Sequence, residues 1–176
     1  GTILINQDIT SDVGALAGID STLKLTNRED ATLANTEDQL LRSVGHALEI
    51  ENLGTFSASG TSGTSAIEAD GPAVRFINAQ GAAFTNEDGG GVTVFDTAGL
   101  ATVSDKFVLV NQGSMSVAGS GLAMDATASG PAITAIGNSG MLSVSGENAA
   151  GLSLIGNGAS GQSLSAPTGE DLTLLG

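Results

Sequence analysis

The sequence predicts an all-β fold, a parallel β-solenoid of about seven coils with roughly 25 residues in each. Apolar residues alternate with small polar ones in short runs such as L-S-V at 142–144 and L-S-L-I at 152–155, which is strand periodicity in pieces too short for helices. Gly provides 26 of the 176 residues, and short motifs recur at a loose spacing. Since one coil cannot bury its own apolar positions, stacked coils must share a core.

The recurring motif is Asn-x-Gly-x-Φ-x-Φ, in which Φ is an apolar or small residue. Its clear copies start at Asn52, Asn111 and Asn138, and weaker copies start at Asn6, Asn27, Asn78 and Asn157. Most copies follow an apolar run, and Gly and Asn suit corners where the chain turns sharply. We therefore expect the three clear copies to occupy equivalent corners, with their side-chain amides forming a ladder along the axis.

Alternation around each motif also predicts which side chains point inward and form apolar columns. The expected set is Phe56, Val74, Phe76, Val94, Val108, Val110, Met115, Val117, Ile133, Leu142, Val144, Leu152 and Leu154. A narrow interior of this kind has little room for large aromatic side chains, which agrees with the absence of Trp and Tyr.

Residues 1–176 form a single solenoid segment in this interpretation, with residues 1–50 less regular than the rest. The long step from Asn78 to Asn111 predicts an insertion in one coil within 85–105. Residues 37–51 have apolar positions at helical spacing, but a turn followed by the strand A-L-E-I-E fits the repeat better. Because repeat-like sequence reaches both ends, we expect a longer array of which this segment is part.

Composition excludes several classes of function. Cys is absent, which rules out disulfides, thiolate nucleophiles and Cys-ligated metals, and a single His rules out a His-cluster metal site. Five basic against 19 acidic residues give a net charge of −14, which disfavours nucleic acid as a partner. No apolar run is long enough for a membrane span. We expect no enzyme, cofactor or metal.

The copies of Asn-x-Gly-x-Φ-x-Φ, together with the parallel runs G-P-A-V at 71–74 and G-P-A-I at 130–133, resemble the passenger regions of bacterial autotransporters and related large secreted adhesins. The resemblance covers about residues 50–160. It implies a right-handed parallel β-helix displayed outside the cell, at the bacterial surface.

One candidate site for chemistry is a set of three acids. Glu68, Asp96 and Asp125 recur at a nearly constant spacing and each follows a Gly closely, so they are expected to stack as an acidic column. Stacked carboxylates raise one another's pKa or gather Ca²⁺. An outward solvated column is the interpretation we favour, and Ca²⁺ binding or polysaccharide cleavage are the alternatives.

Two further motifs invite a chemical interpretation. Gly137–Gly140 (G-N-S-G) resembles the nucleophile motif of serine proteases, with His46, Asp70 and Asp96 upstream in the order of a catalytic triad. Ser139, however, occupies the variable position of the repeat, which favours a corner residue. The run N-E-D-G-G-G at 86–91 hints at a cation loop but matches no calcium motif, so a surface turn is expected.

Three functions are consistent with these patterns. The favoured one is a structural or adhesive segment of an extracellular bacterial surface protein or filament. Its partners would be neighbouring coils, identical subunits or a cell-surface ligand. A self-assembling fibre subunit that stacks end to end through open strand edges is the first alternative. A polysaccharide-active β-helix using Glu68, Asp96 and Asp125 is the second.

Overall fold

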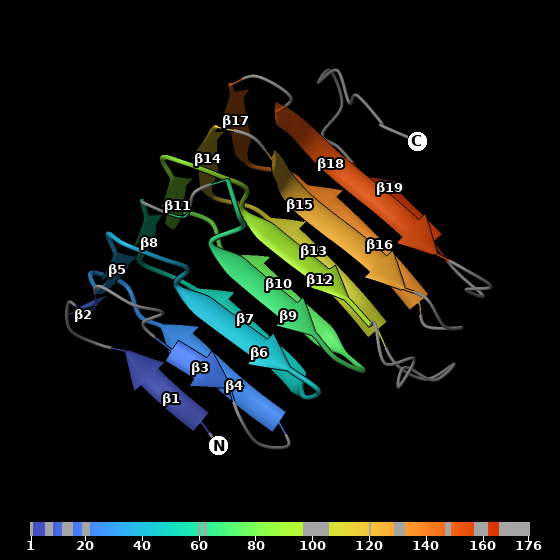
Figure 1. Cartoon of the computed structure of the whole chain (residues 1–176), viewed down its shortest axis with the longest axis horizontal. Helices are drawn as coiled ribbons and strands as arrows, with labels where there is room; N and C mark the ends of the chain where they lie inside the picture. The colour runs from blue at the N-terminus through green and yellow to red at the C-terminus, as the bar shows by residue number, and fades with distance from the viewer. Residues whose placement is uncertain are drawn as a thin grey trace.

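The computed structural model describes residues 2–5, 9–11, 16–18, 22–59, 61, 63–96, 106–119, 121–128, 133–146, 149–156 and 162–165. All regular structure in these residues is β-strand, arranged as a parallel β-solenoid, and residues 22–119 make about four turns of it. The expected seven coils are more than this part of the chain shows. Figure 1 shows β1 (Thr2–Ile5) and β19 (Gln162–Ser165) at opposite ends of the stack.

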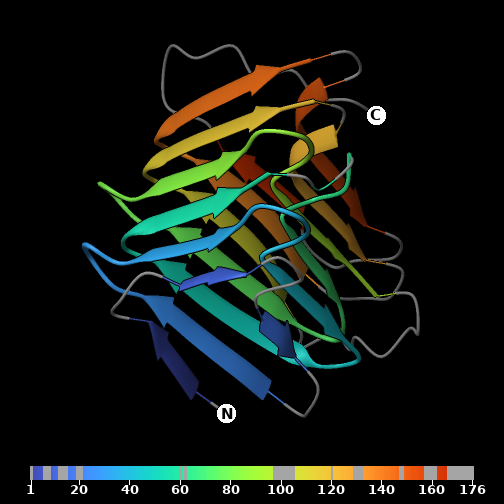
Figure 2. The same ribbon diagram turned by 60° about the vertical axis from the view of Figure 1, so that its left-hand side comes forward.

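Each coil contributes one strand to each of three sheets (Figure 2). Between β1 and β19, sheet A contains β4 (Thr22–Asn27), β7 (Ala47–Asn52), β10 (Val74–Asn78), β13 (Lys106–Asn111) and β16 (Ile133–Asn138). Sheet B contains β2 (Ile9–Ser11), β5 (Thr32–Asn35), β8 (Thr55–Ala58), β11 (Ala83–Asn86), β14 (Ser114–Ala118) and β17 (Met141–Ser145). Sheet C contains β3 (Leu16–Gly18), β6 (Leu41–Val44), β9 (Ile67–Asp70), β12 (Val92–Phe95), β15 (Gly121–Ala128) and β18 (Ala149–Gly156).

The described strands pair in parallel with their counterparts one coil along, so residues at the same position of the coil stack directly. In sheet A, Leu25, Ile50, Phe76, Leu109 and Ile136 form one such column, and all five side chains are buried. Because apolar side chains sit on apolar side chains from coil to coil, the core runs continuously along the axis.

Phenylalanine fills the centre of the core. The ring of Phe84 in sheet B meets Phe56 and Phe76 edge to face, with centroids 6.2 and 5.8 Å apart. These rings and Phe107 are fully buried. The interior thus accommodates single aromatic rings at the middle coils, where sheets A and B face each other.

Most of the expected inward positions are confirmed. Phe56, Val74, Phe76, Val94, Met115 and Val117 are buried, and Leu142 and Val144 pack against the core. The side chains of Ile133, Leu152 and Leu154 lie outside the described part of the structure.

Val108 and Val110 are the exceptions, and the expectation that they point inward is wrong. In β13 the buried residues are Phe107, Leu109 and Asn111, while both valines lie on the outer face. The run F-V-L-V is apolar throughout, so it carries no alternation of its own. Asn111 decides the register, because its amide must reach the interior and strand side chains alternate every second residue.

A ladder of buried asparagines forms the corner between sheets A and B. Asn27, Asn52, Asn78, Asn111 and Asn138 end successive strands and are at most 5 % exposed. Each Nδ2 donates to the Oδ1 of the next asparagine, and all four of these bonds measure 2.8 Å. The expectation that Asn52, Asn111 and Asn138 occupy equivalent corners is confirmed, and the weaker copies at Asn27 and Asn78 belong to the same column.

The two outermost copies of the motif differ from the ladder. The residue paired with Asn27 on β1 is Ile5, not Asn6, and Oδ1 of Asn27 is buried without a hydrogen-bond partner. The apolar run before Asn157 is β18, which belongs to sheet C rather than sheet A. That run therefore does not continue the ladder, while Asn6 and Asn157 themselves lie outside the described residues.

The glycine of the motif is required by close packing, not by a positive φ. A Cβ on Gly54 would collide with the carbonyl oxygens of Arg28 and Ala31 in the preceding coil. A Cβ on Gly113 would collide in the same way with the carbonyl oxygens of Ala79 and Ala82. The two-residue corners thus lie directly against the coil before them, where no side chain fits.

Residues 37–51 form no helix. A bend at 36–38 leads into β6, and β7 (Ala47–Asn52) covers the A-L-E-I-E run, so the strand alternative is confirmed. Leu40, Leu41 and Leu48 point into the core from these elements. The helical spacing arose because the turn between β6 and β7 shifts the phase of a two-residue alternation.

The register of β13 can be tested with two matched aspartates. Leu109→Asp places a charge in the core and should lower the free energy of unfolding by more than about 4 kcal/mol. Val110→Asp places the same charge on the outer face and should cost only about 1 kcal/mol. Urea unfolding followed by circular dichroism measures both. Equal losses would contradict the register.

The asparagine ladder can be tested at its middle member. Asn78→Ala removes the donor to Oδ1 of Asn111 and one acceptor of Asn52 Nδ2. Since buried polar atoms are left without partners, the free energy of unfolding should fall by about 2 kcal/mol or more. Ser116→Ala, a small polar residue exposed on β14, is the control and should change little. A loss no larger than the control's would show that the ladder does not stabilise the fold.

Candidate functional site

The outer face of sheet C holds two of the predicted acids, Glu68 and Asp125, in one column with Thr93 between them, while Asp96 lies outside that column. Glu68 on β9 pairs with Thr93 on β12, and Thr93 pairs with Asp125 on β15. Asp96 lies after the end of β12 and is buried. Asp96 falls outside the column because the coil from Glu68 to Thr93 is shorter than the coil from Thr93 to Asp125, so residues at a constant spacing do not all lie in register. Glu68 and Asp125 are therefore two strands apart, about 10 Å at the usual strand spacing.

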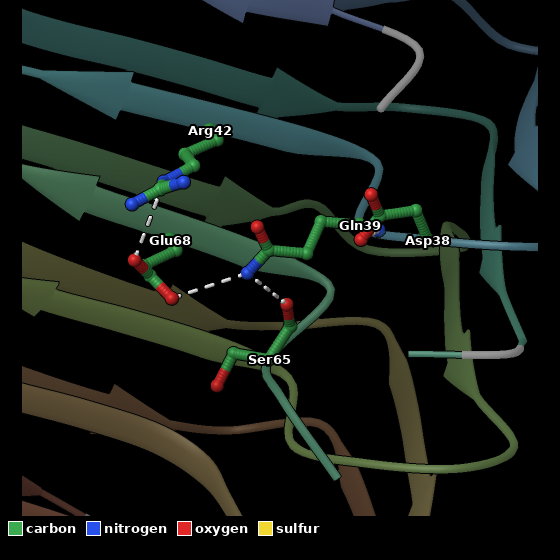
Figure 3. A network of polar contacts seen from close by, with 5 residues as sticks. All are labelled: Asp38, Gln39, Arg42, Ser65 and Glu68. Carbon is green, nitrogen blue, oxygen red and sulfur yellow. Dashed lines mark hydrogen bonds and ion pairs between the residues drawn. The ribbon is translucent and has the colours of Figure 1, made fainter. Parts of the chain in front are cut away.

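Glu68 is held by a network from the coil before it (Figure 3). Arg42 of β6 lies in register with Glu68, with its Nε 3.6 Å from Glu68 Oε1. The amide of Gln39 donates to Glu68 Oε2 at 3.1 Å and to the carbonyl of Ser65 at 3.0 Å. Because both carboxylate oxygens are engaged, Glu68 fastens neighbouring coils to each other rather than facing a cavity.

Asp125 lies in a different environment. In register with it stand two hydroxyl residues, Thr93 on β12 and Ser153 on β18, and Ser153 is only 6 % exposed. Burial raises the pKa of the Asp125 carboxyl above its usual value, while hydrogen bonds from Ser153 and Thr127 act in the opposite direction. Its Oδ1 atom is buried without a hydrogen-bond partner.

The serine-protease interpretation has no geometric support. Ser139 is exposed at the corner between β16 and β17, where its backbone N–H donates to the carbonyl of Asn111. His46 lies at another corner, between β6 and β7, three coils away along sheet A. The structure therefore places the two residues at different corners, and Ser139 is a corner residue of the repeat.

The run at 86–91 is a turn anchored by its first residue. Asn86 is buried at the end of β11, and its Nδ2 donates to the carbonyl of Gly90 at 2.7 Å. Its Oδ1 accepts from the backbone N–H of Asp88 at 3.2 Å. Glu87 and Asp88 are exposed. This is the surface turn that the sequence predicts, with the asparagine closing the loop.

A shallow notch lies at the corner between sheets A and B. Corners 28–31 and 79–82 have four residues each and are exposed at their middle residues, while the corner between them has only Leu53 and Gly54, both half-buried. The notch has a volume of about 360 Å³, and its lining comprises Glu29, Asp30, Leu53, Gly54, Thr55, Gln80 and Gly81. Its walls thus offer carboxylate and amide oxygens at a point where the coil surface is hollowed.

Ion pairs on the outer face of sheet A join three consecutive coils. Glu49 lies in register between Lys24 and Arg75, with contacts of 2.7 Å to Lys24 and 3.3 Å to Arg75. The hydrogen bond from Lys24 and the positive charge of Arg75 lower the pKa of Glu49. All three side chains are more than a third exposed, so solvent screens these contacts.

These outward contacts were not predicted from the sequence. Lys24, Glu49 and Arg75 recur at the repeat length, so the spacing of the charges was a usable signal. Gln39 offered no such signal, because its contacts with Ser65 and Glu68 depend on the shape of the preceding turn.

No group of three or more His, Asp or Glu side chains among the described residues is placed to hold a metal ion. The described residues also include no helix long and apolar enough to cross a membrane.

A scan against protein-family models finds no match, and searches of curated proteins and of solved structures find none either.

The Lys24–Glu49–Arg75 column can be tested with Glu49→Gln. Since the pKa of Glu49 is lowered, its contribution to stability is present above the unfolded-state pKa and is lost as pH falls through the folded-state pKa. At pH 7 and low salt, the variant should lose less than about 1 kcal/mol, because the pairs are exposed. Urea unfolding at low and at 1 M salt measures the loss. An effect that persists at high salt would contradict a screened surface pair.

Proposed function

We propose that this chain is a non-catalytic structural or adhesive segment of an extracellular bacterial surface protein or filament, akin to the passenger regions of autotransporters. The observation that carries the proposal is the unbroken asparagine ladder from Asn27 to Asn138. A polar column that repeats from coil to coil suits a rod of constant cross-section. On this proposal the coil is right-handed and its length extends to about seven coils.

The outer surface gives further support. The ion pairs on sheets A and C, Lys24–Glu49–Arg75 and Arg42–Glu68, each join one coil to the next. Hydrolysis requires a nucleophile, a base and oxyanion donors that converge on one point. The outward columns on sheets A and C instead join successive coils through ion pairs, which suits a surface that adheres or supports.

End-to-end assembly is a second candidate. Among the described strands of sheet B, β17 pairs with β14 alone, and alternate residues along it are exposed. Met141 on this strand is 63 % exposed. An outer strand of this kind offers backbone groups to a second copy in the same parallel register that joins the coils.

Electron microscopy combined with light scattering tests the proposal and separates the two candidates. A structural segment should appear as monomeric rods of uniform length with no release of reducing sugar from polysaccharides. Filaments of indefinite length would favour end-to-end assembly. Val117→Asp, which disrupts the core at the neighbouring strand β14, controls for association of unfolded chains. Catalytic release of sugar that Asp125→Asn abolishes would overturn the non-catalytic proposal.

A further inference from the structure

Asp125 is half-buried, and its hydrogen bonding is incomplete. It lies in the middle of β15, between β12 and β18, and its in-register neighbours are the hydroxyl residues Thr93 and Ser153. The hydroxyls of Ser153 and Thr127 bond to the carboxyl, yet Oδ1 is buried with no partner. A buried carboxylate oxygen with neither a hydrogen bond nor a counter-charge is costly, because it has lost its hydration.

No described basic residue compensates this charge. The strands in contact with β15 are β12, β13, β14, β16 and β18, and their only described charged residue is Lys106, which is exposed at the start of β13. Asp96 follows β12 directly, and Asp70 lies in the neighbouring outward column through Phe95. Glu68 is two strands away and is already engaged by Arg42 and Gln39.

We propose that Asp125 is a pH-sensitive element of the solenoid, and that its protonation strengthens the pairing of β15 with β12 and β18. A proton taken from solvent removes the buried charge. The resulting carboxylic O–H becomes a donor, and the hydroxyl oxygen of Ser153, which already contacts the carboxyl, is one acceptor. On the other side, the in-register hydroxyl of Thr93 lies 2.6 Å from Ser65 Oγ and can donate to it while accepting from Asp125. Acidification thereby stabilises the part of the rod around Asp125.

The direction of the effect follows from proton binding. The folded state holds the proton of Asp125 to a higher pH than the unfolded chain does, since burial raises its pKa above the ordinary value of 3.8. The folded state therefore binds more protons, and the stability supplied by Asp125 falls as pH rises from about 4 through the folded-state pKa.

Melting temperatures of the wild type, Asp125→Asn and Glu87→Gln between pH 4 and pH 8 test the proposal. Glu87→Gln removes one exposed charge and corrects for the general relief of repulsion in an acidic chain. Relative to this control, the melting temperature of Asp125→Asn should rise over that of the wild type by about 3–5 °C as pH rises, for each unit by which the pKa of Asp125 is raised. Asp125→Thr, which continues the hydroxyl column, provides the same comparison if the amide variant fails to fold.

Two readouts separate titration of Asp125 from a merely structural role. Removing the Ser153 hydroxyl in Ser153→Ala should shift the midpoint of the pH response upward, because that hydrogen bond favours the charged form. Hydrogen exchange, corrected for its intrinsic pH dependence, should show greater protection of β15 and β18 at pH 4 than at pH 7 in the wild type only. A melting-temperature difference between the wild type and both Asp125 variants that stays constant with pH would overturn the proposal.

Discussion

Hydrogen bonding between the amides of stacked asparagines is the constraint on which this fold depends. An asparagine at the end of a sheet A strand must point inward to join the ladder, which fixes the face of every other residue on that strand. The amide Nδ2 also donates to a backbone carbonyl at the start of a sheet B strand in the next coil, as Asn52 does to Ala83. One side chain thereby sets the register of two sheets and holds the corner between them.

The fold class and the ladder were predictable because they are properties of a repeat. Coil length and short-range alternation are both visible in the sequence, and the asparagines mark equivalent corners without knowledge of contacts. Alternation fails where a strand is apolar on both faces, as at Val108 and Val110. There the register comes from Asn111, whose inward amide places every second residue before it on the inner face.

The acidic residues were harder to place for a different reason. Glu68, Asp96 and Asp125 share a nearly constant spacing, while the coils that separate them differ in length. An outward position has no strong packing preference, so nothing in the composition distinguishes a residue in register from one a few positions away. Inward columns could be inferred from chemistry, whereas outward columns needed the strand pairing itself.

The ladder also determines how such a chain can change its length in evolution. Every asparagine inside it is a donor to the coil ahead and an acceptor from the coil behind, so removing one whole coil brings a free donor to a free acceptor of the same kind. A duplicated coil can likewise be inserted, because its asparagine supplies one donor and one acceptor to the ladder. A gain or loss of a few residues must instead be absorbed in a corner, as the four-residue corner at 79–82 and the two-residue corner at Gly113 illustrate. Whole coils are thus the unit of insertion and deletion, and corners are where fractional changes accumulate.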